Sequence, residues 1–114
     1  MFELAKLPNA DRAYIDPAKI TDYLLCPTHP KGGPKCAFFE SFGFSPHAPD
    51  QLAAALRLHA TEHDIVTVRR GVSGLKYEIS GPVRAPDGRM PIVRTVWIVR
   101  FIETLPRFVT AVPD

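Results

Sequence analysis

The segment of residues 28–35, Thr-His-Pro-Lys-Gly-Gly-Pro-Lys, gathers residue types suited to acid–base chemistry on an anionic substrate. His29 titrates near neutral pH and suits a general acid or base. Lys31 and Lys35 add positive charge, and Lys35 is expected to begin a helix whose free N–H groups attract phosphate. Gly32 and its neighbouring glycine allow close backbone approach to a ligand. Phosphodiester cleavage needs such a set, whereas the alternative is a solvated connector stiffened by prolines.

Three polar residues in the C-terminal half supply the remaining candidates. Arg94 interrupts a strand that is otherwise apolar on both faces, so it either pairs with a carboxylate or points into a site. Thr95 and Thr110 lie on the last two expected strands and carry hydroxyl donors, although a packed sheet explains them without any site. The predicted catalytic residues are His29, Lys35, Arg94 and Thr110, and the predicted substrate-binding residues are Lys31, Gly32 and Thr95.

Metal and cofactor sites are not expected from the sequence. His59 and His63 are four apart on one helix face, a spacing that can bind zinc, but no third ligand lies nearby in a recognisable pattern. They are therefore interpreted as exposed or half-buried helix residues. Cys26 and Cys36 also lack zinc-site spacing, and a disulfide between them is not expected in a chain without a secretion signal. No phosphate-binding loop, dinucleotide fingerprint or nucleophile elbow is present.

Composition and charge bound the class of protein. A chain of 114 residues with 46% hydrophobic and 23% charged residues is expected to form one globular domain, residues 1–114. The absence of a long apolar run or a signal-like start at residues 1–9 argues for a cytoplasmic protein without a membrane span. The net charge is only +2, which counts against nucleic-acid binding, but residues 64–114 hold eight Lys/Arg and five Asp/Glu.

Helices are expected in the first half of the chain. Asp16 can cap a helix that begins at Pro17 and ends near Cys26. A short helix is expected over residues 35–42, ended by Gly43. A third helix is expected from Asp50, as its cap, to about residue 63, with a buried apolar stripe.

Strands are expected in the second half, at residues 65–69, 75–80, 92–101 and 107–112. The 92–101 segment is apolar on both faces and includes Trp97, so it is expected to be central, with Trp97 in the core. Because every connection is short, the pairing is expected to be antiparallel. The sequence therefore predicts an α+β fold, with two or three N-terminal helices packed on a four-stranded antiparallel meander.

The chain resembles an uncharacterised bacterial domain family along nearly its whole length. The motifs that carry the resemblance occur in order along the sequence: Leu7-Pro8-Asn9-Ala10, Lys19-Ile20-Thr21-Asp22-Tyr23-Leu24-Leu25, His29-Pro30-x-Gly32-x-x-Lys35, Phe38-Phe39, Gly43-Phe44, Pro86-Asp87-Gly88, Arg94-Thr95-Val96-Trp97 and Pro106-Arg107-x-Val109-Thr110-Ala111. The family occurs as stand-alone proteins, often beside a small partner gene, and at the C-termini of polymorphic toxins and phage head-associated proteins. Pro34 and Cys36 depart from its usual pattern.

The resemblance implies an effector, commonly a nuclease. The expected layout is also similar to that of the barnase, EndoU, colicin and RelE ribonucleases, by analogy of fold alone. The leading hypothesis is a toxin-type, metal-independent ribonuclease that acts on RNA phosphodiesters without a cofactor. The alternative is a non-enzymatic binding module of a two-gene pair of the toxin–antitoxin kind. Both hypotheses expect a small cognate protein partner of the antitoxin or immunity type. A nucleotide-dependent transferase ranks last, because no cofactor motif is present.

Overall fold

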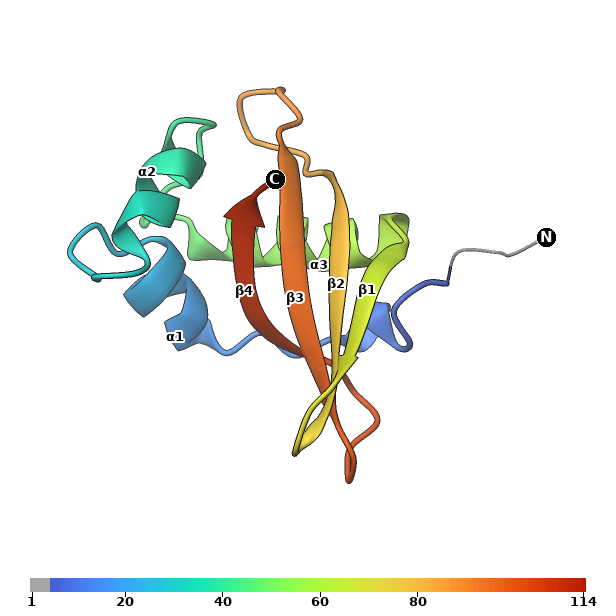
Figure 1. Ribbon diagram of the computed structural model, residues 1–114. Helices are drawn as coiled ribbons and strands as arrows, with labels where there is room; N and C mark the ends of the chain where they lie inside the picture. The colour runs from blue at the N-terminus through green and yellow to red at the C-terminus, as the bar shows by residue number, and fades with distance from the viewer. Residues whose placement is uncertain (1–4) are drawn as a thin grey trace.

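The computed structural model describes residues 5–114, so part of the expectation about residues 1–9 lies outside the described residues. Helices come first and a four-stranded sheet of order β1-β2-β3-β4 follows (Figure 1), which confirms the predicted α+β layout. The elements are η1 (Ala10–Arg12), α1 (Pro17–Lys19), η2 (Ile20–Leu24), α2 (Gly33–Glu40), α3 (Pro49–Glu62), β1 (Ile65–Arg70), β2 (Gly74–Pro82), β3 (Ile92–Arg100) and β4 (Arg107–Pro113). No helix within residues 5–114 is long and apolar enough to cross a membrane.

The sheet is an antiparallel meander with β3 in its interior, as predicted. Trp97 of β3 lies opposite Tyr77 of β2 and Phe108 of β4. Its indole is fully buried, and its ring centre lies 5.2 Å from that of Phe108. Alternation along the strands directs these side chains to one face, which α3 covers in Figure 1. The apolar stripe of α3, including Leu52 and Leu56, belongs to the same core cluster.

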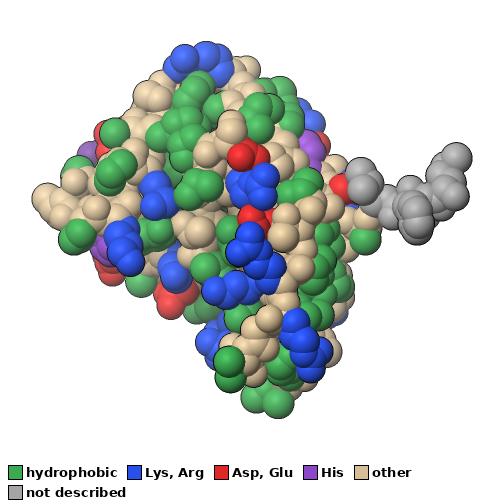
Figure 2. All heavy atoms as spheres, viewed as in Figure 1, with side chains coloured by type: hydrophobic (Ala, Val, Ile, Leu, Met, Phe, Trp, Pro, Cys, Tyr) green, Lys and Arg blue, Asp and Glu red, His purple; other side chains and the backbone are tan. Residues whose placement is uncertain are grey.

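The second face of β3 is only partly covered, although its residues are mainly apolar. Val96 and Ile98 are only half-buried there, and Ile92 is 47% exposed. Figure 2 shows this face of the sheet, where Lys and Arg side chains alternate with acidic and apolar groups. The apolar pattern predicts a central strand correctly, but strand position within a sheet does not require that both faces be covered.

Helix starts follow the sequence with two corrections. Asp16 caps α1 as predicted, since its Oδ1 accepts the Ala18 amide at 3.0 Å. The second helix begins at Gly33 rather than Lys35, because Gly32 takes the capping position and a proline suits the first turn. The third begins at Pro49, so Asp50 lies in its first turn instead of capping it. There its carboxylate still interacts favourably with the helix dipole.

Candidate functional site

Three segments that are distant in sequence meet at the phenol of Tyr23. The Tyr23 Oη lies 2.9 Å from Thr110 Oγ1 on β4. The His29 ring packs edge-on against the phenol, with ring centres 5.1 Å apart. In Figure 1, α1 and α2 lie beyond the β4 edge of the sheet, and this is where the three segments converge. We call Lys19, Tyr23, His29, Lys35 and Thr110 the Tyr23 cluster.

Irregular backbone positions Tyr23 and Thr110. Tyr23 belongs to the π-helical turn η2, in which the Leu25 amide donates to the Ile20 carbonyl at 2.8 Å. Such turns are rare and frequently accompany functional sites. On β4 the register shifts beside Val109, since Trp97 pairs with Phe108 while the preceding residue of β3 pairs with Thr110. A bulge of this kind redirects side chains at a sheet edge.

The loop holds the His29 ring in one tautomer. Its Nδ1 accepts the backbone amides of Lys31 at 3.0 Å and Gly32 at 2.9 Å. A flipped ring would present a C–H group to these two donors, so the orientation is well defined. The neutral ring therefore carries its proton on Nε2. The Nε2–H group is a fixed hydrogen-bond donor, whereas the lone pair of Nδ1 is already engaged.

Two lysines surround the Tyr23 ring. The Nζ of Lys35 lies 5.4 Å from the ring centre and that of Lys19 lies 5.6 Å from it. Lys35 Nζ also donates to the Lys31 carbonyl at 3.1 Å, which restrains its position. Burial raises the pKa of Tyr23, but the hydrogen bond with Thr110 and the two ammonium groups outweigh it. The pKa of Tyr23 is therefore lowered from its ordinary value.

A cavity of about 540 Å³ opens beside the Tyr23 cluster. Every member of the cluster except Lys35 lines it, together with neighbours on the helix, the loop and the strand: Asp16, Ala18, Lys19, Asp22, Tyr23, His29, Lys31, Val109 and Thr110. Lys31, predicted to bind substrate, is exposed at this cavity. Cations, hydroxyl groups and a fixed imidazole N–H therefore face one space, although Asp16 and Asp22 also border it.

The glycines of the loop serve the fold of the loop itself. Gly32 is buried, and a Cβ there would collide with the Tyr23 carbonyl. The next glycine approaches the Pro27 carbonyl, and its amide donates to the His29 carbonyl at 2.8 Å. The predicted close approach therefore occurs, but to the chain's own backbone. The amides near the start of α2 donate hydrogen bonds to His29 and are not free to bind a phosphate. The geometry therefore gives less support to the phosphate site expected at that helix start.

Arg94 lies on the same face as Thr110 but does not line this cavity. Its guanidinium lies between two carboxylates, with Nη1 3.0 Å from Glu78 Oε1 and Nε 3.3 Å from Asp114 Oδ2. These contacts raise the pKa of Arg94, chiefly through the hydrogen bond to Glu78. Of the two alternatives for Arg94, carboxylate pairing is the one that the structure contains.

Thr95 points to the opposite face and belongs to a buried hydrogen-bonded chain. The Trp97 Nε1–H donates to Thr95 Oγ1 at 2.9 Å, and this hydroxyl lies 3.2 Å from His59 Nδ1. His59 Nε2 lies 3.0 Å from the carbonyls of both Gly81 and Val93. His59 is 1% exposed, which corrects the expectation of an exposed or half-buried residue. Within residues 5–114, no three His, Cys, Asp or Glu side chains gather as a metal site.

The two cysteines remain free thiols. Cys36 is buried, and burial together with its hydrogen bond to Glu40 raises its pKa to about 11. The Cys26 pKa is lowered by hydrogen bonds from Thr28. Cys36 is therefore a protonated packing residue rather than a nucleophile.

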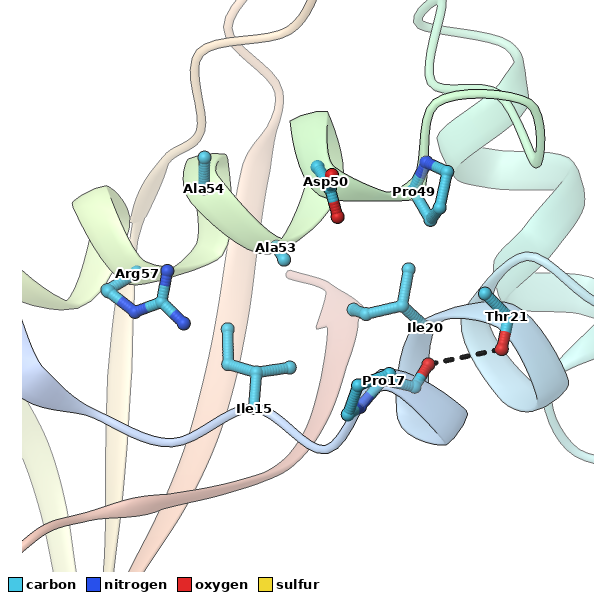
Figure 3. Close-up of a pocket in the computed structure, with 9 residues that line it drawn as sticks. All are labelled: Ile15, Pro17, Ile20, Thr21, Pro49, Asp50, Ala53, Ala54 and Arg57. Atoms are coloured by element: carbon cyan, nitrogen blue, oxygen red, sulfur yellow. Dashed lines mark hydrogen bonds between the residues drawn. The ribbon is translucent and has the colours of Figure 1, made fainter.

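A second cavity, of about 410 Å³, lies between the segment of residues 15–21 and α3 (Figure 3). Figure 3 shows the apolar side chains Ile15, Ile20 and Ala53 between the two walls, with Arg57 toward one end. The Arg57 Nε donates to the Ala13 carbonyl at 3.1 Å, so it ties α3 to the preceding segment. These walls are mainly apolar, whereas the cavity beside Tyr23 collects groups that transfer protons or stabilise anions.

Tyr23 and Lys19 are the site residues that sequence reasoning missed. Tyr23 lies at helical spacing from Ile20 and Leu24, and both of those residues are buried. A polar hydroxyl within an otherwise aliphatic stripe was the available signal. Its partner Thr110 lies 87 residues away, so the sequence alone could not pair them.

Helices on one face and at one edge of an antiparallel meander, with a polar cluster where they meet β4, define the class: a small α+β domain with a candidate site at its edge strand. The chain belongs to the family described as Domain of unknown function (DUF6883), whose model matches residues 6–114. This membership agrees with the predicted resemblance to an uncharacterised family.

The fold is shared with a solved structure. A chain of the contact-dependent growth inhibition toxin–immunity protein complex from Klebsiella pneumoniae 342 matches with a TM-score of 0.68 and 16% identity, covering 88% of this chain and 98% of that chain. At this identity the likeness concerns the fold alone. A comparison with curated proteins gives no match.

Proposed function

We propose that this chain is a toxin-type, metal-independent ribonuclease whose chemistry takes place at the Tyr23 cluster. The observation that carries the proposal is the convergence of Thr110 Oγ1, the His29 ring and two ammonium groups on a phenol whose pKa is lowered. Such groups match the needs of phosphodiester cleavage, which are proton removal and stabilisation of negative charge. The fold shared with a chain of a toxin–immunity complex is a supporting analogy.

The geometry supports the following assignment of roles. The Tyr23 phenolate removes the proton of a ribose 2′-hydroxyl, and the 2′-oxygen forms a bond to phosphorus. The bond from phosphorus to the 5′-oxygen breaks, and that oxygen takes a proton from water, which leaves a 2′,3′-cyclic phosphate and a 5′-hydroxyl. The hydroxide that remains takes the proton from Tyr23, so the phenolate is restored. Thr110 and Lys35 stabilise the phenolate, while His29 Nε2–H and Lys31 stabilise the phosphorane oxygens. The sequence predicts His29 as a general acid or base. The proposed role is instead that of a fixed hydrogen-bond donor, because its Nδ1 already accepts two amide N–H groups.

Purified chain incubated with single-stranded RNA tests the proposal. Wild type is expected to give 2′,3′-cyclic phosphate ends in the presence of a metal chelator. Tyr23→Phe is expected to cleave about 100-fold more slowly, the usual scale for a lost proton-transfer group. Tyr77→Phe is the matched control, because Tyr77 lies on β2 away from the cavity. Intact RNA after prolonged incubation with well-folded wild type would overturn the proposal.

Growth after induced expression gives an independent check. Wild type is expected to arrest growth, whereas His29→Ala and Lys35→Ala are expected to relieve the arrest. His47→Ala and Lys76→Ala are the controls, since both side chains are exposed and lie outside the cavity. If wild type and the site variants grow alike, the alternative of a binding module becomes the better description, and a cognate partner would be sought by co-purification.

A further inference from the structure

A further cavity, of about 230 Å³, adjoins the one beside Tyr23. Asp16, Lys19 and Val109 line both cavities, so the two make a neighbouring pair along the β4 edge. We call this the edge trough. Its far part is lined by Tyr14, Arg100, Arg107, Phe108 and Ile98 in addition to the three shared residues. The lining thus changes from proton-transfer groups at Tyr23 to planar side chains and cations further along.

Backbone hydrogen bonds fix the position of Tyr14. The Tyr14 amide donates to the Pro106 carbonyl at 2.8 Å, and the Phe108 amide donates to the Tyr14 carbonyl at 2.8 Å. These bonds make an isolated parallel bridge between Tyr14 and Arg107. The backbone is held as in a sheet while the side chain remains 47% exposed. A rigid, exposed aromatic ring suits stacking against a planar ligand, because little conformational entropy is lost on binding.

Arg107 lies over the Tyr14 ring and adds a second planar group there. Its guanidinium carbon lies 5.5 Å from the centre of the Tyr14 ring. Glu103 holds the guanidinium through a pair of contacts, Nη2 to Oε2 at 2.7 Å and Nε to Oε1 at 3.2 Å. The carboxylate restrains the guanidinium plane and balances its charge. A pinned guanidinium beside an aromatic ring offers a nucleobase a flat surface of the kind that single-strand binding proteins use.

A cation and a carboxylate both lie where the two parts of the edge trough meet. Lys19 lines both cavities, with its Nζ 5.6 Å from the Tyr23 ring centre, and Arg100 adds a half-exposed cation in the far part. Asp16 lines both parts as well, with its Oδ1 accepting the Ala18 amide. A carboxylate repels phosphate but accepts base N–H groups. The cation at the junction therefore suits the backbone, and the planar part suits a base.

We infer that the edge trough is a nucleotide subsite, in which Tyr14 and Arg107 stack the base next to the cleaved bond while Lys19 contacts the phosphate between them. The inference rests on the proposed function, since it names how the same site would hold its RNA. Single-stranded RNA is the ligand class, because the bases of a duplex are stacked inside the helix and do not reach an edge pocket.

Binding of a fluorescein-labelled single-stranded oligoribonucleotide, measured by anisotropy on the slowly cleaving Tyr23→Phe chain before the RNA is cut, tests the subsite. Adding Tyr14→Ala is expected to weaken binding by about 5- to 150-fold, the range for loss of one stacked base. Adding Tyr14→Phe instead is expected to preserve binding within about 2-fold, because the ring is retained. Phe101→Ala is the matched control, since Phe101 is another half-exposed ring beneath a guanidinium, that of Arg70, and does not line the trough.

An oligonucleotide series with one base removed at each position locates the stacked base. At one position, loss of the base should weaken binding in the Tyr23→Phe chain but not in the chain that also carries Tyr14→Ala. Equal losses in both chains at every position, or unchanged binding on Tyr14→Ala, would overturn the subsite.

Cleavage of single-stranded RNA by the wild-type chain, which keeps Tyr23, is measured separately. Cleavage together with Tyr14-independent binding overturns the subsite and leaves the ribonuclease standing. Tyr14-dependent binding without cleavage supports the subsite and overturns the ribonuclease.

Discussion

Two clusters of this fold use the same kinds of side chain in opposite ways. Thr95, His59 and Trp97 form a buried chain, in which Trp97 donates to the threonine and the histidine ring bonds backbone carbonyls. Thr110, Tyr23 and His29 form a comparable set at the β4 edge, but this set borders an open cavity. The buried set engages its polar atoms internally, so it stabilises the fold. The edge set keeps the His29 Nε2–H on an open loop, so it is able to contact a ligand.

The largest expected effect is on stability, from His59→Ala. The substitution leaves a cavity and removes the partner of Thr95 and of two carbonyls, so the free energy of unfolding should fall by about 3–5 kcal/mol. Urea denaturation followed by circular dichroism measures it. His47→Ala, at an exposed loop position, should change stability by less than about 0.5 kcal/mol. Equal stability of the two variants would remove the contrast between the clusters.

The second effect is on activity, from His29→Ala. Loss of one donor to a developing phosphorane charge is expected to slow RNA cleavage about 100-fold, which corresponds to about 2.7 kcal/mol. Unfolding free energy should change little, because water can replace the ring at the half-buried loop. Cleavage rates and urea midpoints on the same preparation separate the two readouts. A large loss of stability with normal cleavage would assign His29 to the fold instead.

The two threonines offer a matched pair of smaller changes. Thr95→Val leaves Trp97 Nε1 and His59 Nδ1 without their partner, and should cost about 1–3 kcal/mol of stability. Thr110→Val should leave stability nearly unchanged but slow cleavage about 10-fold, because the Tyr23 phenolate loses a hydrogen bond. Thermal melts and cleavage assays on both variants test the pair. The comparison fails if both substitutions affect the same property equally.

The smallest expected effect is a dependence of stability on pH. Burial lowers the pKa of His59 in the folded state, so the unfolded chain binds protons more readily. The contribution of neutral His59 to the free energy of unfolding is complete at pH values above its unfolded pKa of about 6.5. This contribution declines as the pH falls toward the lower pKa of the folded state. The stability difference between pH 7.5 and pH 5.5 measures it.

His59→Phe is the control for this pH dependence, because it should be less sensitive to pH over the same range. Four paired carboxylates have lowered pKa values: Glu62, Asp87, Glu103 and Asp114. The stability that they contribute is lost only below about pH 4.5, outside the range of the measurement. His63, whose ring centre lies 4.9 Å from that of His59, remains in both proteins. Equal pH dependence of the two proteins would contradict the assignment to His59.

Local chemistry made most of the fold predictable. The strand limits, the cap at Asp16 and the positive φ of Gly43, 98°, follow from alternation, capping and turn preferences that act over a few residues. The cap expected at Asp50 was wrong, because Pro49 occupies the first helical position with Ala48 before it. Here the preference of proline for the first turn outweighed the preference of aspartate for the cap.

The site was predictable only in part, because its defining contacts are between distant segments. The loop pattern identified His29 and Lys35, and the structure places both beside Tyr23. Tyr23 itself has the helical spacing of a core residue, and only its contact with Thr110 distinguishes it. Thr95 and Thr110 look alike in sequence, but alternation along paired strands sends one inward and the other to the open edge.

The contact between Tyr23 and Thr110 has a consequence for the order of folding. It joins residues 87 positions apart, so it closes a loop that spans most of the domain. Helices and neighbouring hairpins need only local contacts and form sooner than contacts of such long range. A refolding chain would thus regain its helical signal and its Trp97 burial in stages, while any chemistry at Tyr23 would wait until β4 has docked beside the helices.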